Sequence, residues 1–99
     1  MRIKEKRNRD IITLEISGNL DTNSSAEFQE ALLNSFRNAN HVVLDLEGCN
    51  YVSSAGLRVL LMGQKTSIAK KKTMKLINVT EVFMSVLEIS GLVDILTIE

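Results

Sequence analysis

The sequence is poor in the residues that build most catalytic and metal sites. It contains one cysteine and one histidine in 99 residues, so it holds no disulfide framework, no Cys-rich zinc site and no multi-histidine metal cage. It has no proline, and its five glycines are scattered, so no linker or low-complexity tract divides the chain. We therefore expect a single domain, residues 1–99, with no cofactor and no resident metal.

Neither sign of charge is in excess, and long hydrophobic runs are missing. Lys and Arg number 12 against 12 Asp and Glu, whereas a general nucleic-acid binder carries a basic excess. No apolar run approaches the roughly 20 residues that cross a bilayer, and residues 1–6 lack the apolar stretch of a signal peptide. We expect a cytoplasmic protein without nucleic-acid partners or direct membrane insertion.

Hydrophobic periodicity predicts an α/β domain. Alternation of apolar residues at 11–17 indicates a half-buried strand, and the i, i+3, i+4 spacing at 24–38 indicates a helix that begins with a Ser24–Glu27 capping box. Thr80 is expected to cap the third helix, and Gly91 to end it. The order β-β-α-β-α-β-α-β favours a mixed, mostly parallel sheet with helices packed on it. The expected strands are 2–6, 11–17, 41–46, 73–79 and 93–98, and the expected helices are 24–38, 57–69 and 80–90.

One segment, residues 47–58, departs from plain core-building because two adjacent serines precede a buried helix. One interpretation is that Ser53 or Ser54 is simply an N-cap. The other is that one serine caps while its neighbour is an exposed hydroxyl that can be phosphorylated, since helix N-termini favour anionic groups. Gly56 either leaves space for a partner to approach the backbone or serves close packing of the helix on the sheet.

The whole chain resembles the STAS domain of bacterial anti-sigma-factor antagonists, which regulate sigma factors by partner switching. Three stretches carry the resemblance: Gly-Asn-Leu-Asp at 18–21, Leu-Asp-Leu at 44–46 followed by Tyr-Val-Ser-Ser-Ala-Gly-Leu at 51–57, and Ser-Gly-Leu at 90–92. All three occur in the family's order across nearly the full length. The resemblance implies a single STAS-like fold and a regulatory protein rather than an enzyme, with no catalytic residues.

The resemblance places the phosphorylated serine at Ser54. Ser53 stands where many members have Asp, which makes it a competing acceptor, and Ala55 stands where many have a second hydroxyl residue. Asp21 matches an acidic residue near the serine, where it either orients the Ser54 hydroxyl or caps the following turn. The partner-binding residues implied in this way are Asp21, Thr22, Asn23, Ser53, Ser54, Ala55, Gly56, Leu57 and Arg58.

The function implied by the resemblance is that of an anti-sigma-factor antagonist. The unphosphorylated chain would bind an anti-sigma factor with serine-kinase activity and release a sigma factor; phosphorylation of Ser54 would reverse this, and a serine phosphatase would reset it. The free protein is expected to be a monomer. The alternative is a non-enzymatic STAS accessory subunit of a transporter or sensory complex, in which Ser54 is a cap and the same helix face a permanent contact.

Overall fold

Four strands form one mixed sheet in the computed structural model, which describes residues 1–99. The first pair is antiparallel, the second and third pairs are parallel, and the spatial order follows the chain. The α/β class and the mixed, mostly parallel sheet are therefore confirmed. The strands are β1 (Arg2–Asn8), β2 (Ile11–Leu20), β3 (His41–Val52) and β4 (Thr73–Ile77).

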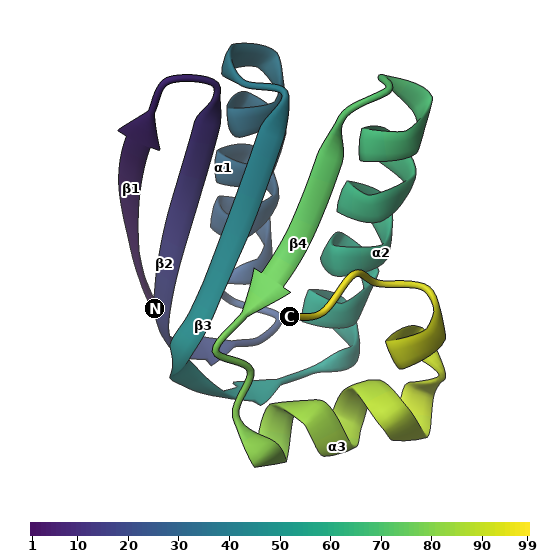
Figure 1. Ribbon diagram of the computed structural model, residues 1–99. Helices are drawn as coiled ribbons and strands as arrows, with labels where there is room; N and C mark the ends of the chain where they lie inside the picture. Colours follow the sequence, from purple (N-terminus) through teal and green to yellow (C-terminus); the bar gives the residue numbers. More distant parts are fainter.

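The three helices are α1 (Ser25–Asn38), α2 (Ser54–Ala69) and α3 (Glu81–Ser90). Both α1 and α2 lie behind the sheet, and α3 crosses the end where the parallel strands finish (Figure 1). The other face of the sheet is left without a helix. No helix combines the length and the apolar character that spanning a bilayer requires.

The core lies between the sheet and the two helices behind it. The predicted alternation in β2 is confirmed, because Ile12, Leu14 and Ile16 are each 1% exposed. The predicted stripe of α1 is confirmed in the same way, with Phe28 and Phe36 fully buried at 0%. Burial of such side chains contributes about 1.5–3 kcal/mol each, so the fold depends on these two faces meeting.

β3 continues six residues beyond its predicted end at Leu46, and two register shifts against β2 explain why the sequence pattern failed there. A β-bulge adds one residue to one strand and turns the following side chains. After the shifts, burial recurs every third residue, at Leu46, Cys49 and Val52. This spacing does not look like a strand in the sequence, yet it carries the chain to the start of α2.

The helix boundaries confirm two predicted signals and correct two others. Thr80 accepts from the Phe83 amide at 3.3 Å, and Gly91 ends α3 in the left-handed conformation with φ 79°. The Ser24–Glu27 capping box is wrong, because Ser24 makes no side-chain cap bond to the helix and donates instead to the Asn19 carbonyl at 2.8 Å. α2 begins at Ser54 rather than at residue 57.

The predicted last strand, residues 93–98, is wrong. Gly91 is followed by a short 3-10 turn, Leu92–Asp94, whose Leu92 side chain is buried. The chain meets the sheet only at an isolated parallel bridge between Ile98 and Leu76, whose hydrogen bonds are made by Thr97 and Glu99. Leu96 is buried and Val93 and Ile98 pack against the core, whereas Ile95 is 50% exposed. The segment therefore contributes apolar side chains to the core without forming a strand.

Candidate functional site

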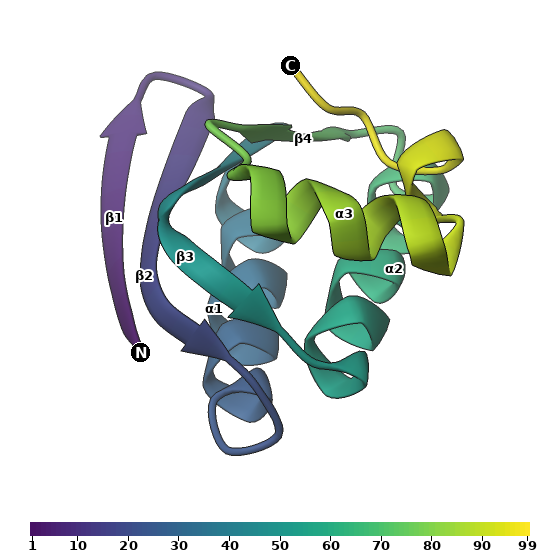
Figure 2. The same cartoon turned by 90° about the horizontal axis from the view of Figure 1, so that it is seen from below.

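The ends of β2 and β3 bring the two halves of the candidate site together. Leu20 and Val52 are paired in the parallel register, and the Ser53 amide donates to the Leu20 carbonyl at 2.9 Å. The loop after β2 and the first turn of α2 therefore lie at the same end of the sheet, as Figure 2 shows from below. The sequence-predicted residues at 21–23 and 53–58 are thus gathered on one end of the molecule.

Ser54 is the first residue of α2, and it is exposed. Ser53 occupies the N-cap position with an extended backbone, but its side chain makes no cap hydrogen bond. Its hydroxyl oxygen is buried and has no hydrogen-bond partner. Since no acidic residue lies in the first turn either, the amides at the start of α2 have neither a side-chain cap nor a negative charge within that turn. An anionic group on Ser54 would meet the positive end of the helix.

Asp21 organises the turn before α1. Its carboxylate oxygen Oδ1 accepts from the Asn23 amide at 3.0 Å and from the Ser24 amide at 3.1 Å. No hydrogen bond joins Asp21 to Ser54. Of the two roles left open by the sequence, the geometry supports capping of the turn.

Gly56 is buried beneath the exposed start of α2. A Cβ atom at this position would lie 2.8 Å from Leu20 Cγ, 2.9 Å from Val52 Cγ2 and 3.0 Å from the Leu20 carbonyl oxygen. The missing side chain therefore faces the ends of β2 and β3. Of the two roles that the sequence left open for this glycine, the geometry supports close packing of the helix on the sheet.

The remaining predicted residues divide by exposure. Thr22, Asn23 and Arg58 are exposed, whereas Ala55 and Leu57 are half-buried. An accessible surface at this end is thus formed by the β2–α1 loop together with Ser54 and Arg58. Gly56 supports that surface from below and does not belong to it.

Two neighbouring features were missed from the sequence. A shallow depression of 530 Å³ runs along the outer side of α2 and begins at Arg58. Tyr51, the only tyrosine, is 51% exposed just before the site. The residues that line the depression follow the i, i+3, i+4 spacing of one helix face, and this spacing is visible in the sequence. The leucines of the helix lie on more than one face, so the sequence did not single this face out. The depression is lined by Arg58, Leu61, Met62, Lys65, Thr66 and Ala69.

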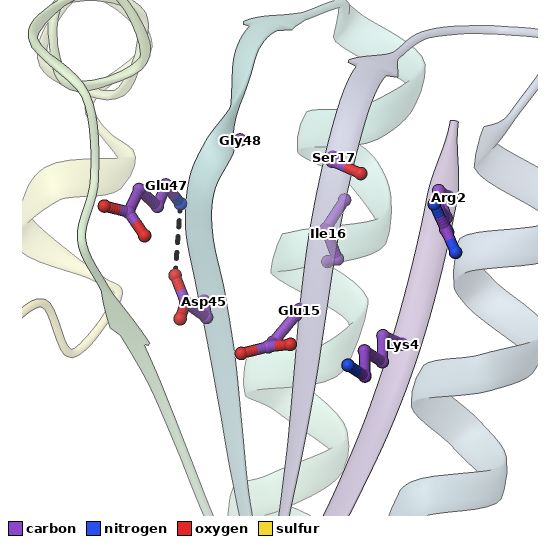
Figure 3. A pocket seen from close by; sticks show the side chains of 8 residues that line it. All are labelled: Arg2, Lys4, Glu15, Ile16, Ser17, Asp45, Glu47 and Gly48. Atoms are coloured by element: carbon purple, nitrogen blue, oxygen red, sulfur yellow. Dashed lines mark hydrogen bonds between the residues drawn. The ribbon is translucent and has the colours of Figure 1, made fainter.

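The open face of the sheet carries charged side chains around a hollow, among them Arg2, Lys4, Glu15, Asp45 and Glu47. Asp45 accepts from the Glu47 amide and from the Asn78 side chain, each at 3.1 Å, and Figure 3 shows its carboxylate beside a hollow between β1 and β3. No group of three or more His, Cys, Asp or Glu side chains is arranged to hold a metal ion. Burial raises the pKa of the Cys49 thiol, which keeps it protonated and unreactive at neutral pH.

Comparison with known proteins identifies the class of domain. Residues 3–97 match the sequence model of the family described as "Mlab, STAS domain", and the chain belongs to this STAS-domain family. The resemblance expected from the motifs at 18–21, 51–57 and 90–92 is therefore confirmed at the level of the family. No curated protein sequence matches the chain significantly.

Solved structures share the fold at low sequence identity. An anti-sigma factor antagonist from Mycobacterium paratuberculosis has a TM-score of 0.87 and 14% identity, covering 98% of this chain and 83% of that chain. The Bacillus cell fate determinant SpoIIAA in its phosphorylated form has a TM-score of 0.77 and 16% identity, covering 99% and 91%. A sulfate transporter family protein from Wolinella succinogenes has a TM-score of 0.77 and 14% identity, covering 88% and 71%.

Proposed function

We propose that this STAS domain is a non-enzymatic interaction switch of the anti-sigma-factor antagonist type. In its unphosphorylated form it binds an anti-sigma factor that is also a serine kinase, through the surface around Ser54. Transfer of phosphate to Ser54 ends the contact, and a serine phosphatase restores it. The similarity in fold to an anti-sigma factor antagonist and to phosphorylated SpoIIAA supports this proposal.

The observation that carries the proposal is the environment of the Ser54 hydroxyl. It is exposed at the start of a 16-residue helix whose N-cap side chain makes no cap bond and whose first turn has no acid. A phosphate adds about −1.5 to −2 charges at neutral pH, and the positive end of the helix tolerates that charge without loss of the fold. The same charge in a packed interface has to be desolvated, which opposes binding.

Ser54 and Ser53 differ in how easily a kinase can reach their hydroxyl groups. Ser53 is half-buried, and its hydroxyl oxygen is shielded from solvent, so a kinase reaches it only if the start of α2 opens. Ser54 needs no such opening. Asp21 holds the neighbouring loop in shape and acts on the contact through that loop.

The experiment is phosphate transfer followed by mapping. The chain is incubated with ATP and each candidate serine kinase from its own genome, and the modified residue is identified by mass spectrometry. Ser54→Ala should abolish labelling, and Ser53→Ala is the matched control that should leave it intact. Phosphate found only on Ser53 would overturn the residue assignment, and no labelling by any kinase would argue against the switch.

An accessory subunit of a transporter or sensory complex is the second candidate, favoured by the fold shared with a sulfate transporter family protein. In that case the exposed end around Ser54 is a permanent contact. Purification of the tagged chain from its own cells distinguishes the two. A permanent subunit brings the same partner down with Ser54→Ala and with Ser54→Asp, whereas the switch loses its partner with Ser54→Asp.

A further inference from the structure

The zero net charge of the chain conceals a strong separation of charge along the sequence. Residues 48–80 contain no Asp or Glu, and residues 76–99 contain no Lys, Arg or His. The basic groups of the first stretch are concentrated around the α2–β4 turn, with Lys70, Lys71 and Lys72 in succession. An exposed cluster of one sign attracts a partner of the opposite sign, with an effect that salt screens.

The fold adds further cations to this cluster. Because β2, β3 and β4 are parallel, the connections that precede them meet at one end of the sheet, the upper end in Figure 1 and opposite to Ser54. Hydrogen bonds tie the three connections together: the His41 amide donates to the Asp10 carbonyl at 3.1 Å, and the Thr73 amide to the Asn40 carbonyl at 2.9 Å. The exposed cations gathered at this end are Arg7, Arg9, Lys70 and Lys71, whereas Lys72 is half-buried and donates to the Phe36 carbonyl.

The single carboxylate among these connections is already engaged. Asp10 accepts from the Asn40 amide at 3.0 Å and from the Asn40 side chain at 2.7 Å. It therefore fixes the turn between β1 and β2, and its charge acts on the neighbouring Arg7 and His41. Neither Lys70 nor Lys71 makes a side-chain hydrogen bond or an ion pair.

An apolar hollow lies beside these cations on the open face of the sheet. It measures 340 Å³ and is lined by residues at the beginnings of β2, β3 and β4. Ile11 is 40% exposed at its edge, Val43 is 8% exposed, and Lys75 extends along it. Lys75 already pairs with the Glu99 carboxylate at 3.3 Å, which shows that a carboxylate fits beside the hollow.

We propose that this basic end surface, formed by Ile11, His41, Val43, Thr73 and Lys75 with the cations of the adjoining turns, binds an acidic segment of a partner protein. One aliphatic side chain of that segment fills the hollow, and its carboxylates face Lys75 and the turn cations. The surface lies at the opposite end of the sheet from Ser54, so it is independent of the proposed switch and both ends can be occupied together.

Two observations favour an acidic peptide over other anionic partners. Phe28, Phe36 and Phe83 are fully buried, and Tyr51 lies near the opposite end. His41 is therefore the one aromatic ring at this surface, and it is held by a hydrogen bond to the Thr73 hydroxyl at 2.7 Å. A single ring does not make the row of aromatic side chains on which successive bases of a single strand stack. The apolar element is a hollow between strands, which receives a side chain, whereas membrane-surface binding uses an apolar helix face that inserts into the lipid.

The test uses a fluorescein-labelled synthetic peptide of aspartate and glutamate with two central leucines, titrated with the full chain and followed by fluorescence anisotropy. We expect saturable binding that weakens as sodium chloride is added. Ile11→Ser and Lys75→Glu should each weaken it about fivefold, and Lys65→Glu, the same charge change on the far side of α2, should leave it nearly unchanged. Thermal melting of each variant checks that the fold is intact.

The outcomes separate the proposal from its competitors. Absence of saturable binding overturns the proposal. An equal loss of peptide affinity with Lys65→Glu and with Lys75→Glu also overturns it, because the attraction then depends on the total charge and not on this surface. Tighter binding of polyuridylate or of phosphatidylglycerol vesicles than of the peptide, unaffected by Ile11→Ser, would also overturn it. Replacement of both peptide leucines by serine should reproduce the loss seen with Ile11→Ser.

Discussion

Substitution of Gly56 by alanine tests whether the start of α2 is shaped by the fold or by a partner. The added methyl group would lie 2.8–3.0 Å from Leu20 and Val52 atoms, although carbon atoms in contact prefer about 3.5–4.0 Å. Two of these neighbours are branched side-chain carbons and the third is a backbone oxygen. The helix or the ends of β2 and β3 must therefore shift by several tenths of an ångström.

The change in stability caused by Gly56→Ala follows from two opposing effects. Overpacking of a well-packed core costs about 1–3 kcal/mol, and alanine recovers up to about 1 kcal/mol relative to glycine in a helix. We expect a net loss of about 1–2 kcal/mol for Gly56→Ala. For a domain of this size that loss lowers the melting temperature by about 5–15 °C.

Thermal and urea unfolding of Gly56→Ala, with Ser54→Ala as the control two residues away, measure this loss. Ser54 is exposed and makes no hydrogen bond, so its replacement should change stability little. If Gly56→Ala melts at or above the parent temperature, the packing argument is refuted and room for a partner again becomes the explanation of the glycine.

Three further predictions concern stability and reactivity. Asp21→Ala removes the acceptor of two amide hydrogen bonds and should cost about 1–2 kcal/mol in urea unfolding; an unchanged midpoint would contradict the turn role. Hydrogen bonds from the Asn40 amide and side chain lower the pKa of Asp10 from 3.8, so its contribution is complete above that value and is lost as pH falls below it. The stability difference between the parent and Asp10→Ala should therefore shrink in acid, and a constant difference would exclude the linkage. Cys49 should react slowly with an aromatic disulfide reagent until the chain unfolds, and rapid native labelling would show that it is not buried.

The parts of the fold that follow a regular period could be predicted from the sequence. The alternation of Ile12, Leu14 and Ile16 and the stripe of Phe28 and Phe36 gave the correct elements and the correct faces. Regular elements repeat their side-chain direction, so the pattern survives in the sequence. Irregular backbone leaves no such repeat.

Irregular backbone is the cause of three wrong predictions. The two register shifts in β3 changed the burial period to three residues, which hid the strand after Leu46. The apolar run after Gly91 begins with a 3-10 turn, and composition alone does not distinguish that turn from a strand. Ser24 lies at a helix start but uses its hydroxyl within the preceding loop, on the Asn19 carbonyl, which a local capping pattern does not reveal.

The sequence was enough to locate the candidate site, but it did not decide what Asp21 and Gly56 do there. The resemblance located Ser54, and the structure places that serine on an exposed helix start. Asp21 could cap the turn or orient the Ser54 hydroxyl, and the donors that face its carboxylate decide between these roles. Gly56 could leave space for a partner or allow close packing of α2, and its distance to Leu20 decides this. The role of Asp21 depends on the local geometry of the turn after β2, and that of Gly56 depends on the parallel pairing that brings the ends of β2 and β3 under α2. The basic end surface likewise arises only when three separate connections meet.

The central claim is that the charge state of Ser54 controls partner binding without altering the fold. Once the cognate kinase is known from phosphate transfer, isothermal titration of that kinase with the unphosphorylated chain and with the chain phosphorylated on Ser54 measures this directly. We predict binding weaker by roughly two orders of magnitude for the phosphorylated chain, equivalent to about 3 kcal/mol, with melting temperatures that agree closely. Equal affinities for the two forms would contradict the account.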